Sequence, residues 1–158
     1  MKIRKIEKTD NKELAKMLKT VLTEVGANAD GFAFTDPQLD NMFEYYDTQI
    51  GNYYVVVNNE GTIIGGAGIG ALDGETSTME LQKMYFLPET RGKGIAQKLL
   101  DHLMLEAKEN GFQQCYLETL DGLDAALALY RRNGFTLIDK PLGNTGHFGC
   151  NVYMLKSL

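Results

Sequence analysis

Apolar residues along this chain recur in two patterns, one with the period of a helix and one with the alternation of a strand. Stripes at helical spacing run from Leu14 to Leu22 and from Ile95 to Ala107, and they predict two amphipathic helices. Asp10 followed by Glu13 predicts a capping box at the start of the first helix, and Gly26 predicts its end.

Two shorter helices and a set of strands complete the prediction. One short helix begins at Asp36-Pro37, and the residues expected on its apolar face are Leu39, Met42, Phe43 and Tyr46. The other runs from Asp124 to Asn133. The strand-like runs cover residues 1–7, 53–57, 62–69, 77–87, 113–119, 135–138 and 149–155.

In chain order these elements read β-α-α-β-β-β-α-β-α-β-β. This order favours an α/β fold of the α+β kind, with a mixed central β-sheet flanked by helices. The strand–helix–strand unit over residues 77–119 predicts two parallel strands joined by a right-handed crossover. With 158 residues, of which 44% are hydrophobic, the chain is expected to form a single domain over residues 1–158.

The net charge and the cysteine content limit the functions that this chain is expected to have. A net charge of −5 argues against nucleic acid and against an anionic membrane surface as partners. Residues 1–10 lack the apolar segment of a signal peptide, so a cytoplasmic protein is expected. Cys115 and Cys150 are expected to be buried thiols, and with only two histidines in the chain we expect no metal site.

The most informative segment is the turn between the strand over 77–87 and the helix that follows it. Gly92 and Gly94 allow the backbone to approach a ligand closely, and the first N–H groups of the helix have no partner within it. Arg91 and Lys93 add positive charge, so the turn predicts a site for a phosphate or pyrophosphate. An ordinary strand-to-helix turn with charged flanks has the same pattern.

Two motifs give the chain a family resemblance. Arg91-x-x-Gly94-x-Ala96 resembles the Q/R-x-x-G-x-G/A motif of the GNAT superfamily of N-acetyltransferases. The stretch from Leu129 to Phe135 is similar to that family's LYxxxGF signature. The chain is identified as a small, single-domain, bacterial-type member. The resemblance implies a GNAT fold, in which two splayed parallel strands form the cleft for acetyl-CoA.

The resemblance also implies roles for individual residues. Tyr130 would protonate the departing thiolate, and Glu80 would act as general base. The implied cofactor-binding residues, through backbone groups, are Met84, Tyr85, Phe86, Arg91, Gly92, Lys93, Gly94, Ile95 and Ala96. One departure from the family is Leu123, at a position where many members carry an asparagine that contacts the cofactor.

Each assigned role has an alternative. Tyr130 could be a core aromatic residue, and Glu80 an ordinary solvated carboxylate. Glu118 is the rival general base, a water chain could replace both carboxylates, and His147 has the pattern of a loop hydrogen-bonder. Side-chain alternation along the strand over 77–87 predicts one shared face for Glu80, Gln82, Met84 and Phe86.

The expected activity is acetyl transfer from acetyl-CoA, without a metal, to a primary amine of a small molecule or peptide. The sequence leaves two alternatives, a CoA-binding module without catalysis and an enzyme with a hydroxyl acceptor. The acceptor pocket is expected to form from residues 20–46 and 140–149. Whether the chain forms a homodimer stays open.

Overall fold

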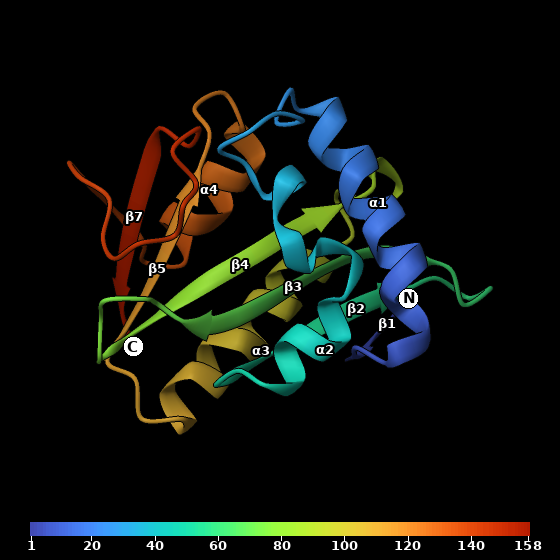
Figure 1. Cartoon of the computed structure of the whole chain (residues 1–158), viewed down its shortest axis with the longest axis horizontal. Coiled ribbons are helices and arrows are strands. Elements are labelled where there is room, and N and C mark those ends of the chain that lie inside the picture. The colour runs from blue at the N-terminus through green and yellow to red at the C-terminus, as the bar shows by residue number, and fades with distance from the viewer.

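One mixed β-sheet runs through the computed structural model, which describes residues 1–158 (Figure 1). Its seven strands lie in the order β1-β2-β3-β4-β5-β7-β6. The strands are β1 (Lys2–Lys5), β2 (Gly51–Val57), β3 (Ile63–Ala71), β4 (Thr78–Phe86), β5 (Gln114–Thr119), β6 (Thr136–Ile138) and β7 (Val152–Ser157). The helices are α1 (Asn11–Glu24), α2 (Met42–Asp47), α3 (Ile95–Glu109) and α4 (Asp124–Arg132). The predicted order of elements and the mixed α/β fold are confirmed.

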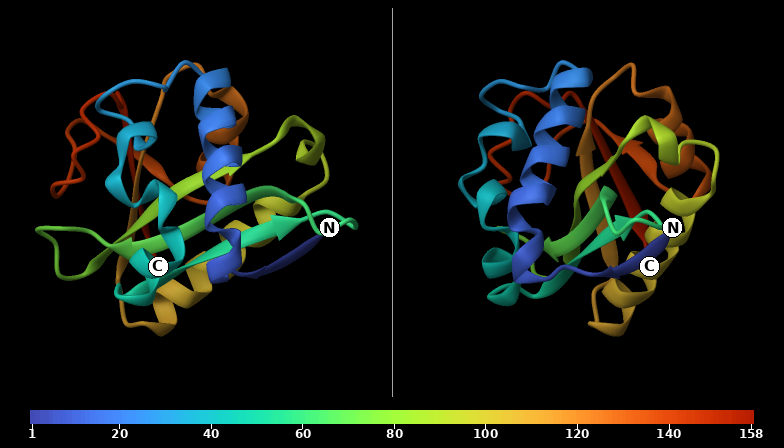
Figure 2. Two further views of the ribbon diagram at one scale, coloured as in Figure 1. Left: turned by 45° about the vertical axis from the view of Figure 1, so that its right-hand side comes forward. Right: turned by 90° about the vertical axis from the view of Figure 1, so that its right-hand side faces the viewer.

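The helices cover the sheet on both faces (Figure 2). Helices α1 and α2 pack on one face, where Leu18 and Met42 join Val55 of β2 in one apolar cluster. Helices α3 and α4 pack on the other, where Leu103 and Leu127 belong to a larger cluster. Complete burial of each such side chain contributes about 1.5–3 kcal/mol, so both faces stabilise the sheet.

Only β4 and β5 are parallel neighbours, and helix α3 connects them. The other neighbouring strands are antiparallel. The parallel pair predicted for residues 77–119 is therefore confirmed. It places the carboxyl ends of β4 and β5, and the turn that opens α3, at the same edge of the sheet.

The capping contacts predicted for the start of the first helix are wrong. Asp10 does not cap α1 with its side chain, because Arg4 donates to both of its carboxylate oxygens at 2.6 and 2.8 Å. A capping box lies one turn earlier, between Glu7 and Asp10. Glu13 accepts a hydrogen bond from the backbone N–H of Ile63 at 2.9 Å instead. A guanidinium compensates a buried carboxylate better than one backbone N–H does, so tertiary contacts prevail over the local motif.

The helix predicted from Asp36 is also different, because it is interrupted at Asn41. A single 3-10 turn covers Pro37–Asp40, and the α-helix begins only at Met42. The side chain of Asn11 accepts a hydrogen bond from the N–H of Phe43 at 2.9 Å. This contact satisfies a free donor at the start of α2 and fixes the second helix as a separate element.

A β-bulge in β4 changes which side chains share a face. Lys83 has a φ of 49°, and the pairing register of β4 with β3 shifts there. Because the bulge adds a residue to the alternation, Met84 and Phe86 pack on the α3 and α4 side, whereas Tyr85 packs on the α1 side. The prediction that Glu80 shares a face with Gln82 therefore holds, but the prediction that Met84 and Phe86 lie on that face is wrong.

Candidate active site

A cavity of about 870 Å³ opens where β4 and β5 diverge. The two strands pair only from Thr78↔Gln114 to Glu80↔Tyr116, although β4 continues to Phe86. Beyond Glu80 the edge of β4 that faces β5 has no strand partner, and residues 80–86 line the cavity. The splayed parallel strands expected from the sequence are thus present, and they form its walls.

The turn before α3 lies at one end of this cavity. Gly92 and Gly94 have φ values of 72° and 70°, and a Cβ added at either would meet no atom within 4 Å. Both glycines therefore border open space, and both adopt the left-handed conformation that other residues avoid. No side chain caps α3 at this end.

Only part of the predicted turn has free backbone donors. The N–H of Arg91 donates to Pro88 O at 3.1 Å, and that of Lys93 donates to Thr90 O at 3.4 Å. Lys93 also does not line the cavity. The donors without a partner belong to Gly92, Gly94, Ile95 and Ala96, all of which line it. Together with the helix dipole they form an anion site. The Arg91 side chain reaches Glu24 of α1 at 2.9 Å.

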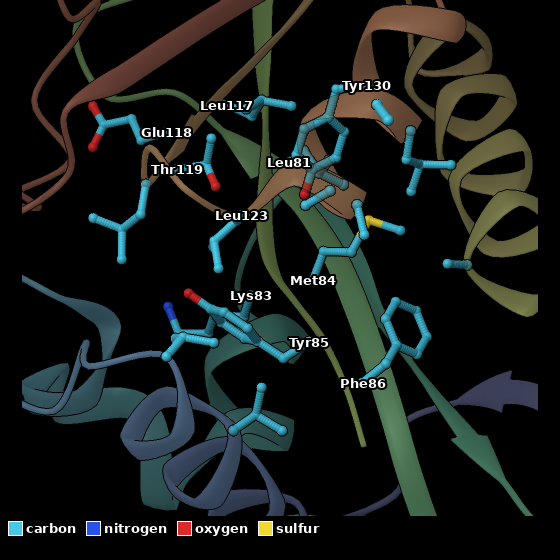
Figure 3. A pocket seen from close by; sticks show the side chains of 18 of the residues that line it. Leu81, Lys83, Met84, Tyr85, Phe86, Leu117, Glu118, Thr119, Leu123 and Tyr130 are labelled. Carbon is cyan, nitrogen blue, oxygen red and sulfur yellow. The ribbon is translucent and has the colours of Figure 1, made fainter. Parts of the chain in front are cut away.

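Tyr130 projects from α4 toward the same cavity (Figure 3). Its ring is buried against Phe135, with 5.8 Å between the ring centroids. The hydroxyl makes no hydrogen bond within the protein, and no buried side-chain oxygen or nitrogen lacks a partner. The hydroxyl therefore faces the cavity, where it is free to donate. Burial raises the pKa of Tyr130, so the phenol stays protonated at neutral pH.

Glu80 is not an ordinary solvated carboxylate, because only 8% of the residue is exposed. The amide of Gln82 donates to one carboxylate oxygen at 2.7 Å, and the Tyr46 hydroxyl donates to the Gln82 carbonyl at 2.6 Å. Burial raises the pKa of Glu80, although the Gln82 hydrogen bond and the charges of His147 and Lys83 act the other way. A carboxylate with a raised pKa is a stronger base.

Glu118 lies on β5, on the same face of the sheet as Glu80, because Glu80 is opposite Tyr116 and side chains alternate along the strand. Its carboxylate accepts hydrogen bonds from the Tyr116 hydroxyl at 2.7 Å and from the Thr145 hydroxyl at 2.9 Å. In Figure 3 Glu118 lies on the opposite side of the pocket from Tyr130. The rival base and the tyrosine that faces the cleft therefore lie across the pocket from each other.

A buried charge cluster beside Glu80 was not predicted as a unit. The Lys83 ammonium is 2.5 Å from one oxygen of Asp36, and His147 Nε2 is 2.9 Å from the other. Burial alone would raise the pKa of Asp36, but His147 and Lys83 lower it, and Asp36 in turn raises the pKa of His147 against the effect of burial. The signal in the sequence was Lys83 itself, a lysine within a strand that is largely buried. Its positive φ is visible only in the structure.

Neither cysteine forms a disulfide, and Cys115 is buried whereas Cys150 is half-buried. The cavity wall includes Cys150, and burial raises the pKa of its thiol to about 12. No group of three or more His, Cys, Asp and Glu residues is arranged to bind a metal ion. None of the helices has both the length and the apolar character needed to cross a bilayer.

Comparisons with known proteins agree with this geometry. The family model described as the Acetyltransferase (GNAT) family matches residues 17–135. The protein described as "Uncharacterized N-acetyltransferase YjgM" from Escherichia coli K12 is 47% identical over 158 residues, which cover 99% of this chain and 94% of that protein.

Solved structures share the fold over the whole chain. A GNAT-family acetyltransferase from Staphylococcus aureus Mu50 superposes with a TM-score of 0.85 at 24% identity, covering 99% of this chain and 98% of the other. A phosphinothricin acetyltransferase of the GNAT superfamily from Sinorhizobium meliloti, solved in complex with AcCoA, gives 0.78 at 25% identity, covering 99% and 88%.

Proposed function

Because this chain belongs to the GNAT acetyltransferase family, we propose that it transfers the acetyl group of acetyl-CoA to a primary amine of a small molecule or peptide. One observation carries the proposal. A single cavity joins the open N-terminus of α3 to the buried Glu80 carboxylate and to the unpartnered Tyr130 hydroxyl. Such an arrangement supplies an anion site, a base and an acid to one ligand.

The residues of the cleft fit acetyl-CoA. The free N–H groups of Gly92, Gly94, Ile95 and Ala96 would bind the pyrophosphate, with the positive end of the helix dipole behind them. The open edge of β4, at Met84, Tyr85 and Phe86, would bind the pantetheine arm through backbone groups, as an added strand does. Leu123 lines the cavity and adds only apolar surface.

The proposed chemistry uses two side chains. Glu80 accepts a proton from the attacking amine, which then forms a bond to the acetyl carbon. Tyr130 donates its phenolic proton to the sulfur as the carbon–sulfur bond breaks. Burial raises the pKa of both groups, which makes the Glu80 carboxylate a stronger base and keeps the Tyr130 phenol protonated until it donates. No metal is required in either step.

We also propose that residues 1–158 act as one GNAT domain. Strand β1, near the first residue, and strand β7, near the last, belong to the same sheet. The cavity takes its lining from α1, β4, α3, β5, α4 and the loop that precedes β7. The site therefore needs residues from nearly the whole chain.

Two measurements on the purified protein test the proposal. Calorimetry with acetyl-CoA in the presence of a chelator should show binding, and an amine panel should release free CoA. Absence of binding heat at high micromolar cofactor would contradict the cofactor site. Cofactor binding without CoA release from any amine would point to a non-catalytic module, and release with alcohols alone to a hydroxyl acceptor.

A further inference from the structure

Seven Asp, Glu, Lys, Arg or His side chains line the cavity, and apart from Asp124 at the start of α4 they fall into two groups. Arg91 and Arg132 lie at the end formed by the α3 turn and α4, where the pyrophosphate is proposed to bind. At the other end lie the carboxylates of Glu80 and Glu118, together with Lys83 and His147. The charges of these two carboxylates and two cations would balance if they formed ion pairs with one another. They do not form such pairs.

Both cations at this end are paired with a third carboxylate. Lys83 and His147 each contact Asp36, at 2.5 and 2.9 Å, and Asp36 does not line the cavity. Neither Glu80 nor Glu118 has a lysine, arginine or histidine nitrogen within salt-bridge distance, since their hydrogen-bond donors are neutral. With Asp36 included, this end has three carboxylates and two cations, so the acceptor end of the cavity has an excess of negative charge.

We propose that the acceptor carries a second positive charge, that Glu118 binds this charge, and that the reacting amine lies at Glu80. This inference rests on the proposed acetyl transfer and specifies its acceptor class, a short chain with a cationic group at each end. Tyr130 marks the reacting end, because its unpartnered hydroxyl faces the cavity on the side opposite Glu118 (Figure 3).

Glu118 is suited to bind a cation. Its two hydrogen bonds come from the hydroxyls of Tyr116 and Thr145, one to each carboxylate oxygen. A carboxylate offers about four acceptor positions, so about two remain for a ligand. The two hydroxyls fix the orientation of the carboxylate and leave its charge intact. The half-buried position strengthens an ionic contact relative to the open surface.

The spacing of the two carboxylates sets the length of the acceptor. Glu80 lies opposite Tyr116 on the neighbouring strand, and Glu118 is two residues farther along the same face. Strand geometry then puts the Cα atoms of Glu80 and Glu118 about 8 Å apart, before the strands diverge further. The cavity wall also has the apolar side chains of Phe32, Ala33 and Leu120. These side chains suit the methylene groups of a chain of four or five carbons.

Matched acceptors and variants test the inference. The probes are pentanediamine, aminopentanol, in which a hydroxyl replaces the second amine, and pentylamine. The wild-type protein should acetylate the diamine with a kcat/KM about tenfold or more above the amino alcohol, because a charged hydrogen bond is lost in the latter. Glu118→Gln, which keeps an acceptor for one hydroxyl, should abolish this preference, so that kcat/KM for the diamine falls to the value for the amino alcohol.

Glu60→Gln serves as the control, since Glu60 is exposed in the turn between β2 and β3 and does not line the cavity. It should leave the preference unchanged. Circular dichroism and Tm establish that each variant is folded. Equal kcat/KM for the diamine and the amino alcohol in the wild-type protein overturns the inference, and so does a preference that survives in Glu118→Gln.

Two other outcomes separate this inference from the proposed function. A uniform loss of kcat for all three probes in Glu118→Gln would show that Glu118 is the general base. It would overturn the inference that Glu118 binds the second positive charge of the acceptor. Failure of the wild-type protein to release CoA with any amine, in the panel or among the probes, overturns the proposed function itself. Acetylation of other amines but none of the three probes overturns only the acceptor class.

Discussion

Two side chains, Glu80 and Tyr130, are buried in a way that an ordinary core residue is not. Glu80 is desolvated but receives only neutral hydrogen bonds, and Tyr130 has a hydroxyl with no partner although its ring is packed. A buried carboxylate with a raised pKa and a hydroxyl that is free to donate into a cavity are typical of functional sites. The two residues are therefore the first places to test the chemistry.

Tyr130→Phe should lower kcat by about 10²- to 10⁴-fold, the usual contribution of a general acid, with little change in cofactor affinity. The substitution removes only the hydroxyl and keeps the ring contact with Phe135. Steady-state kinetics and calorimetry with CoA measure the two quantities. A kcat within about twofold of the wild-type value, with chemistry rate-limiting, would show that Tyr130 is structural.

Glu80→Gln should lower kcat/KM and remove the acidic limb of its pH profile, because the amide cannot accept a proton. The same variant should be more stable than the wild-type protein at neutral pH. Burial raises the pKa of Glu80 in the folded protein above its value in the unfolded chain. The resulting contribution to the free energy of unfolding is fully present below the unfolded-state pKa, where Glu80 is protonated. It is lost as pH rises through the folded-state pKa, because the buried side chain then becomes charged.

The Tm of Glu80→Gln should accordingly exceed the wild-type value at neutral pH, and the difference should shrink toward acidic pH. Full activity of Glu80→Gln at every pH, with loss of activity in Glu118→Gln, would move the base to Glu118. Full activity in both variants would favour a water chain.

At the scale of elements, the proposed cofactor site depends on the junction between β4 and α3. The left-handed Gly92 and Gly94 turn the chain so that the first N–H groups of α3 face open space. The bulge at Lys83 lies in the part of β4 that no longer pairs with β5, and the Tyr53 hydroxyl stabilises it by donating to the Lys83 carbonyl at 2.9 Å. The first feature exposes backbone donors, and the second sets which side chains of β4 face the cavity.

Gly94→Asp should weaken CoA binding by more than tenfold, because it adds a negative charge where a phosphate is proposed to lie. It also places a side chain at positive φ, which costs about 1 kcal/mol of stability. Gly94→Ala imposes the same backbone strain without the charge. Gly61→Asp, at φ 87° in a distant turn with open space, imposes strain and charge away from the site.

Calorimetry with CoA measures all three variants. We expect Gly94→Asp to bind most weakly, Gly94→Ala to lose less affinity and Gly61→Asp to bind as the wild-type protein does. Unchanged CoA affinity in a folded Gly94→Asp protein would place the pyrophosphate site elsewhere.

At the scale of the whole molecule, the cavity lies between two apolar clusters on opposite faces of the sheet. The α1 and α2 side supplies the acceptor wall, and the α3 and α4 side supplies the anion site and Tyr130. Because the sheet is splayed between them, a ligand that fills the cleft contacts both sides.

Acetyl-CoA should therefore raise the Tm of the protein. A ligand that binds only the folded state at about 100 times its Kd adds about 2.7 kcal/mol, which for a chain of this size corresponds to roughly 5–10 °C. Thermal denaturation with increasing cofactor measures the shift, and a chelator should not change it. Tyr130→Phe should retain the shift and Gly94→Asp should lose most of it. A Tm that is independent of acetyl-CoA would contradict binding in this cleft.

The sequence by itself determined the order of elements, the parallel strand pair and the position of the glycine turn that opens α3. These features follow from local causes. Apolar periodicity sets the helices and strands, and Gly92 and Gly94 are required by a backbone conformation that few other residues adopt. The family motifs around Arg91 and Tyr130 are also contiguous in sequence, so they could be read without a structure.

Only the tertiary structure decided which side chains meet. The Arg4–Asp10 contact displaced a capping box, the bulge at Lys83 shifted the alternation of β4, and Asp36 paired with both Lys83 and His147. In each case a charge or packing interaction between elements outweighed a local preference worth about 1 kcal/mol or less. For this reason the uncompensated carboxylates, and the acceptor class inferred from them, could not be read from the sequence.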